Sequence, residues 1–141
     1  MSMEKRIGYL IKRVQQALRL RMDNDLKYFN LTTAQYAALN ALEQTPNASS
    51  AELARACFVT PQTMTQIIQS LKTAGFITRQ LHPAHGRIIQ TVLSAKGQST
   101  LQSAHKSIAK IEKVMIADLQ SDEQEKLVEQ LERFYNNLNL K

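Results

Sequence analysis

The sequence is poor in the residues from which many active sites are built. It has one cysteine, four glycines, three prolines and no tryptophan among 141 residues. The lone Cys57 excludes an internal disulfide and any zinc site made from several cysteines. The glycines fall in no phosphate-binding pattern, and the sequence contains no recognisable pairing of nucleophile and base. We therefore expect a protein that is not an enzyme and that uses no metal and no cofactor.

Long hydrophobic runs are also absent. The apolar stretches are interrupted by Lys, Arg, Gln or Thr and fall short of the roughly 20 residues that span a bilayer. The charged start of the chain is not followed by the uninterrupted apolar segment of a signal peptide. With 43% hydrophobic and 21% charged residues, the composition is typical of one soluble globular domain. We expect a cytoplasmic protein with no membrane partner.

Acidic residues are missing from the middle of the chain. The net charge is +6, from 18 Lys and Arg against 12 Asp and Glu, and no acidic residue occurs between Glu52 and Glu112. That stretch contains seven basic residues, which are Arg55, Lys72, Arg79, Arg87, Lys96, Lys106 and Lys110. A run of charge is usually only a solvated surface, but this segregation predicts a positive surface in the middle of the chain and an anionic partner.

Both ends of the chain are predicted to be helical. Near the start, apolar residues recur at helical spacing at Ile7, Leu10, Ile11, Val14, Leu18 and Met22. Near the end, Ser94 opens a helix expected to run to about Leu119, and Ser121 with Gln124 forms a capping box for a last helix. These helices have more apolar surface than one small domain covers, so we expect a homodimer in which residues 1–31 and 98–141 form the dimerisation helices.

The central segment reads as a helix-turn-helix followed by a hairpin. Capping boxes at Thr32 and Ser49 open two helices, and Thr60 with Pro61 opens a third that ends at Gly75. Two β-rich runs follow, Phe76 to Leu81 and Ile88 to Leu93, joined by a turn that contains proline and glycine. The expected fold is predominantly α with a small β wing, a winged helix-turn-helix in residues 32–97 flanked by the terminal dimerisation helices.

This arrangement predicts binding to double-stranded DNA. The third helix of the segment buries an apolar stripe and exposes Gln, Thr and Ser, and such side chains read bases in a major groove or contact phosphates. An arginine at the hairpin tip suits the minor groove. The predicted DNA-binding residues are Ser49, Thr60, Gln62, Thr63, Thr65, Gln66, Gln69, Arg79, His85 and Arg87.

Two stretches resemble the MarR family of transcription regulators. The segment Leu31 to Leu39 is similar to the opening of that family's winged domain. The family's wing reads Asp-Pro-x-Asp-x-Arg followed by Leu-Thr-x-x-Gly, and here His82-Pro83-Ala84-His85-Gly86-Arg87 and Leu93-Ser94-Ala95-Lys96-Gly97 stand at the same spacing. The resemblance covers essentially the whole chain. It implies a bacterial, dimeric repressor that binds a near-palindromic operator and is released by a small anionic aromatic ligand.

The wing departs from the family pattern at two positions, because His82 and His85 stand where the family has acids. Free histidine protonates below about pH 6.5, so the sequence predicts a DNA affinity that rises as the pH falls through that range. The His-x-x-His spacing also suggests a metal site. Surface histidines are the commoner interpretation on a loop that has no cysteine or carboxylate beside them.

Three interpretations remain open beside these. Cys57 is interpreted as a small core residue of its helix, not as a redox sensor. A winged helix can also bind protein instead of DNA, and a basic protein can coat DNA without sequence preference. A strong preference for one palindromic duplex distinguishes a regulator from both.

Overall fold

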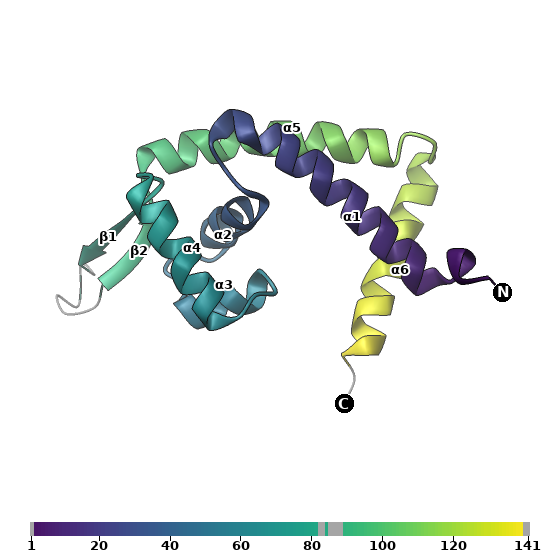
Figure 1. The fold of residues 1–141 in the computed structure, drawn as a ribbon, viewed down its shortest axis with the longest axis horizontal. Coiled ribbons are helices and arrows are strands. Elements are labelled where there is room, and N and C mark those ends of the chain that lie inside the picture. The colour runs from purple at the N-terminus through teal and green to yellow at the C-terminus, as the bar shows by residue number, and fades with distance from the viewer. Residues whose placement is uncertain (1, 82–83, 85–88, 140–141) are drawn as a thin grey trace. The chain divides into compact units, whose positions relative to one another are not determined.

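The computed structural model describes residues 2–81, 84 and 89–139. The chain divides into two compact units, Met1–Ile108 and Ala109–Lys141. Within the described residues, no helix has the length and apolar character needed to cross a membrane. The helices and strands of Figure 1, in chain order, are η1 Met3–Lys5, α1 Ile7–Leu26, η2 Lys27–Phe29, α2 Thr33–Gln44, α3 Ser50–Ala56, α4 Pro61–Thr73, β1 Ile77–Leu81, β2 Ile89–Leu93, α5 Ala95–Met115 and α6 Ser121–Leu138.

The helix starts in the first unit follow the predicted caps. The Thr32 hydroxyl accepts from the Gln35 N–H, and the Gln35 side chain accepts from the Thr32 N–H, so the predicted capping box opens α2. Ser94 caps α5, because its hydroxyl accepts from the Gly97 N–H at 3.0 Å. Gly75 ends the α4 segment with a φ of +81°, the left-handed backbone that glycine adopts without strain.

A single apolar core holds the helix-turn-helix to α2 and α5. The inward stripe of α4 is the one the sequence predicted, and α4 contacts α2, α3 and β1. The buried residues include Leu39, Leu42, Leu53, Ala54, Met64, Ile67, Ile68, Leu71, Ile77, Leu101 and Ala104. The core therefore fixes α4 by one face and leaves its other face exposed.

The wing is a two-stranded antiparallel sheet. β1 pairs with β2 in a register that sets Ile77 opposite Leu93 and Arg79 opposite Thr91. The predicted strand starts one residue early, because Phe76 is buried against the core before the pairing begins. Position 88, predicted as the start of the second strand, lies outside the described residues.

Two sequence predictions for the last helices were wrong in their details. α5 ends at Met115 and not near Leu119, because the Ala117 and Leu119 N–H groups bond three residues back, which closes turns instead of extending the helix. The next cap lies one residue before the predicted one. The Gln120 N–H donates to the Glu123 carboxylate at 3.0 Å, so the capping box joins these two residues.

The terminal helices expose much of their apolar stripes. On α1, Ile7, Leu10, Ile11 and Val14 are between 41% and 68% exposed. On α6, Leu131, Phe134, Tyr135 and Leu138 are between 44% and 86% exposed. Such contiguous apolar positions on a helix are unfavourable in water unless another surface covers them.

Candidate nucleic-acid interface

The interface centres on the start of α4. Thr60 is the N-cap, and its hydroxyl accepts from the Thr63 N–H at 3.1 Å and donates to the Thr63 hydroxyl at 3.0 Å. Pro61 occupies the first helical position, where its lack of an N–H costs no hydrogen bond. Among the described residues, the Gln62 N–H is then the backbone donor of this first turn without a partner, and it lies in a favourable position for a phosphate.

The outward face of α4 carries the predicted base-reading side chains. Gln62, Thr63, Thr65, Gln66 and Gln69 are all exposed. The Thr65 hydroxyl donates to the Pro61 carbonyl at 3.0 Å, which leaves it able to accept, and the Gln69 amide contacts Thr73 at 3.5 Å. Among the described residues, the amides of Gln62 and Gln66 have no hydrogen-bond partner, so both can pair with the edge of an adenine.

A polar contact joins the second half of α4 to α2. The Gln35 amide donates to the Ser70 hydroxyl at 3.0 Å, and that hydroxyl donates to the Ile67 carbonyl at 2.7 Å. Ser70 is therefore engaged within the fold. Gln35 serves the cap of α2 and this contact together, so the orientation of α4 depends on the same residue that starts α2.

Ser49 lies at the start of α3, as the sequence predicted. Its hydroxyl accepts from the Glu52 N–H, and its own N–H donates to the Glu52 carboxylate, both at 3.1 Å. These hydrogen bonds from Ser49 lower the pKa of the Glu52 carboxyl. The negative charge in this first turn weakens the attraction for a phosphate, so Ser49 is a poorer phosphate contact than Thr60.

The wing residues are described only in part. Arg79 is exposed on β1, paired in register with Thr91. His85 and Arg87 lie outside the described residues, as does His82. Their roles at the wing tip remain predictions from the sequence.

Two basic residues near α4 were not among the predicted contacts. Arg55 in the last turn of α3 and Lys72 in the last turn of α4 are both exposed. The signal that could have identified them was present, since both lie in the stretch that lacks acidic residues. They add positive charge to the helix-turn-helix and suit the phosphate backbone.

Cys57 and Phe58 lie in the turn between α3 and α4. Phe58 has a φ of +57° and is 83% exposed, a strained backbone for a bulky residue. Cys57, predicted to be a core residue, is only half-buried because it follows the last residue of α3. Partial burial raises the pKa of the Cys57 thiol.

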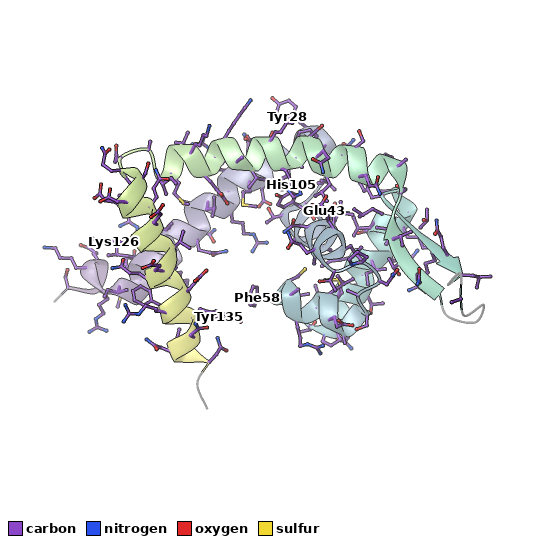
Figure 2. All side chains as sticks on the ribbon, turned by 180° about the vertical axis from the view of Figure 1, so that it is seen from behind. Tyr28, Glu43, Phe58, His105, Lys126 and Tyr135 are labelled. Carbon is purple, nitrogen blue, oxygen red and sulfur yellow. The ribbon has the colours of Figure 1, made fainter. Side chains whose placement is uncertain are left out.

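Sequence reasoning also missed two hydrogen bonds that join α2 to α5 through His105. His105 has only 29% of its side chain exposed. Its Nδ1 lies 2.7 Å from the Tyr36 hydroxyl, and its Nε2 lies 2.9 Å from Oε1 of Glu43 (Figure 2). With the carboxylate accepting from Nε2–H, a neutral ring leaves Nδ1 to accept from the tyrosine. A heptad pattern cannot reveal this pairing because the partners are 62 and 69 positions apart.

Comparison with known proteins supports the interpretation of this geometry. Residues 29–88 match the model of the MarR family. The HTH-type transcriptional repressor Rv2887 of Mycobacterium tuberculosis is 32% identical over 127 residues, which cover 90% of this chain and 91% of the relative.

Solved structures agree with the sequence match. Rv2887 in complex with salicylic acid has a TM-score of 0.78 at 30% identity, over 95% of this chain and 99% of that one. Rv2887 in complex with DNA has a TM-score of 0.75 at 30% identity, over 92% and 97%. A MepR–DNA complex of S. aureus, at 20% identity and a TM-score of 0.83 over 98% and 100%, shares the fold.

The sequence match covers 90% of this chain and the structural match 95%, so the agreement extends over nearly the whole chain. This protein belongs to the MarR family of winged helix-turn-helix transcription regulators.

Proposed function

We propose that the protein is a sequence-specific, ligand-responsive transcription repressor that binds a near-palindromic operator as a homodimer. The observation that carries this proposal is the outward face of α4, where the exposed amides of Gln62 and Gln66 lie beside a capped helix start in a lobe without acidic residues from 53 to 108. The named relative Rv2887 has been solved in complex with DNA, which supports the same use of this face here.

The dimer is supported by the terminal helices. The exposed apolar positions on α1, from Ile7 to Val14, and on α6, from Leu131 to Leu138, are suited to a symmetric helical interface. We assign residues 1–31 and 98–141 to dimerisation and residues 32–97 to DNA binding. Two-fold symmetry then places the two α4 helices on half-sites about one helical turn apart.

A small aromatic acid is the proposed inducer class. Rv2887 has been solved with salicylic acid, and this chain offers a pocket of about 470 Å³ whose lining includes Tyr28, Phe29, Phe76 and Lys96. The Lys96 ammonium lies 5.0 Å from the centre of the Phe76 ring. Aromatic rings beside an ammonium are complementary to an aromatic carboxylate.

The test is a fluorescence anisotropy titration with the duplex upstream of the protein's own gene and a shuffled duplex, at about 150 mM salt. A preference of roughly a thousandfold for the first duplex supports a regulator. Gln66→Ala should reduce specific binding by about 1–3 kcal/mol and relax the base preference. The matched control Gln44→Ala, at the exposed end of α2, should leave the preference unchanged.

The other outcomes have distinct meanings. Equal and steeply salt-dependent binding to both duplexes indicates a protein that coats DNA. Absence of binding to either indicates a winged helix that recognises protein. Salicylate added to the preformed specific complex should release the DNA, and a complex insensitive to it contradicts the aromatic-acid half of the proposal.

A further inference from the structure

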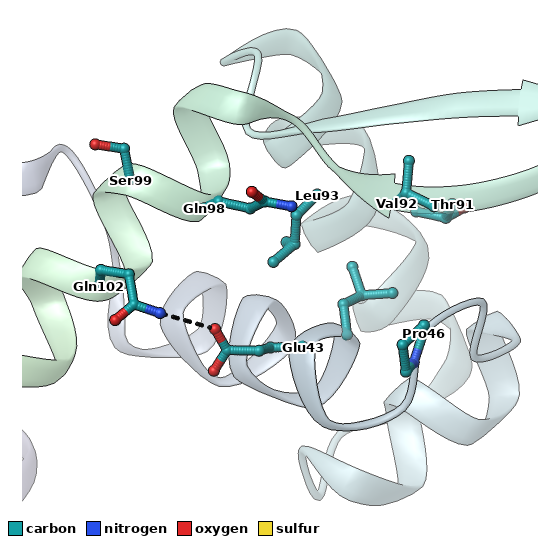
Figure 3. A pocket seen from close by; sticks show the side chains of 9 residues that line it. Glu43, Pro46, Thr91, Val92, Leu93, Gln98, Ser99 and Gln102 are labelled. Carbon is teal, nitrogen blue, oxygen red and sulfur yellow. Dashed lines mark hydrogen bonds between the residues drawn. The ribbon is translucent and has the colours of Figure 1, made fainter.

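A groove separate from the α4 face lies where α2, β2 and α5 meet. It has a volume of about 600 Å³, within the usual range of about 300–1,000 Å³ for small-molecule sites. Its apolar part comes from Leu42, Pro46, Val92 and Leu93. Figure 3 shows Pro46 after the end of α2, Val92 and Leu93 on β2, and the amides of Gln98 and Gln102 on α5.

One ionisable side chain lines this groove, and it is acidic. Among the described residues, Glu43 is the only charged member of the lining, and 34% of its side chain is exposed. The polar groups beside it are neutral, chiefly the amides of Gln98 and Gln102. The Gln102 amide donates to Oε2 of Glu43 at a long 3.4 Å (Figure 3), while Oε1 accepts from His105.

This distribution of charge discriminates between ligand classes. An aromatic carboxylate in the groove meets the like charge of Glu43 and finds no lysine or arginine in the part of the lining that the structure describes. A cation gains an opposite charge in a partly desolvated site, where such an interaction is stronger than in bulk water. The weakly engaged Oε2 leaves the carboxylate an oxygen with which to meet it.

We propose that the α2–β2–α5 groove binds a small organic cation, with an ammonium group against Glu43 and an aromatic or alkyl body against Leu42, Pro46 and Val92. The site is distinct in its charge from the pocket at Lys96. The binding itself does not depend on the DNA-binding function, and only its regulatory meaning rests on that proposed function.

The experiment is isothermal titration calorimetry of the full chain with benzyltrimethylammonium. The neutral probe is N,N-dimethylbenzamide and the anionic probe is salicylate. We expect saturable binding of the cation, weakened at least tenfold by Glu43→Gln and retained within a few-fold by Glu43→Asp, which keeps the charge. Asp118→Asn removes an exposed carboxylate from the turn after α5 and should have no effect.

Circular dichroism establishes that each variant is folded, and Glu43→Asp keeps the test decisive if Glu43→Gln does not fold. The proposal is overturned by absence of saturable cation binding, by equal binding of the neutral probe, or by a Glu43→Gln variant that is folded and binds as well as wild type. Anisotropy with operator DNA on the same preparation separates this result from the DNA-binding proposal. A protein that prefers its operator but ignores the cation refutes the groove alone.

Discussion

Replacement of Gly97 by alanine should destabilise the protein strongly. A Cβ at this position would lie 2.0 Å from the Phe76 carbonyl oxygen and 3.0 Å from its carbonyl carbon. Both are backbone atoms, so α5 and Phe76 would have to separate by about 1 Å to relieve the overlap. That shift would stretch the hydrogen bond from the Ser94 N–H to the same carbonyl, now 3.0 Å, beyond the usual limit.

The expected cost combines two effects. Overpacking of a tight contact costs about 1–3 kcal/mol, and a lost hydrogen bond costs about 1 kcal/mol. We therefore expect Gly97→Ala to lower the free energy of unfolding by about 3 kcal/mol, measured by urea denaturation at one fixed protein concentration.

Gly8→Ala is the matched control. Gly8 lies in α1 with no atom within 4 Å of its added Cβ, so alanine should stabilise the helix by up to about 1 kcal/mol. If the free energy of unfolding of Gly97→Ala stays within about 0.5 kcal/mol of wild type, the range usual for surface substitutions, the packing argument is refuted.

Three further predictions concern titrating groups and the wing. The pKa of Glu52 is lowered in the folded protein, so its carboxylate stabilises the fold above the unfolded pKa and loses this effect as the pH falls through the folded pKa. The difference in melting temperature between wild type and Glu52→Ala should therefore shrink on acidification from pH 7. A constant difference contradicts this prediction. The raised pKa of Cys57 predicts slower alkylation by iodoacetamide at pH 8 than in the urea-unfolded chain, and equal rates contradict it. DNA affinity should rise from pH 8 to pH 6 and lose this dependence in a variant with His82→Asn and His85→Asn, and a flat pH profile of the wild type argues against this role of the histidines. Arg87→Ala should weaken DNA binding by about 1–3 kcal/mol, and an unchanged affinity argues against a wing contact.

Local signals explain why much of the fold was predictable. Capping boxes, Pro61 at a first helical position and Gly75 at a left-handed end act within a few residues, so the sequence carries them openly. The buried stripe of α4 follows from helical periodicity for the same reason. The cap of α6 was missed by one residue because Gln120 competes with Ser121 next to it, and spacing does not rank adjacent caps.

Contacts between distant segments explain what the sequence could not show. The resemblance placed Gly97 in a family motif without a reason, and the reason is the Phe76 carbonyl against which it packs. The exposed face of α4 was predictable because it is the complement of the buried stripe, whereas the groove at Glu43 depends on how three separate elements meet. Periodicity describes one element at a time, so it identifies surfaces of helices and not cavities between them.

The groove and the hydrogen bonds of His105 between α2 and α5 share the Glu43 carboxylate. Tyr36 and Glu43 lie two turns apart on α2, and His105 of α5 bridges them through its two ring nitrogens. A cation placed against Oε2 would share the Glu43 carboxylate with His105, whose Nε2 holds Oε1. β2 and α5 line the same groove as α2, so the proposed cation would contact all three elements from a single site.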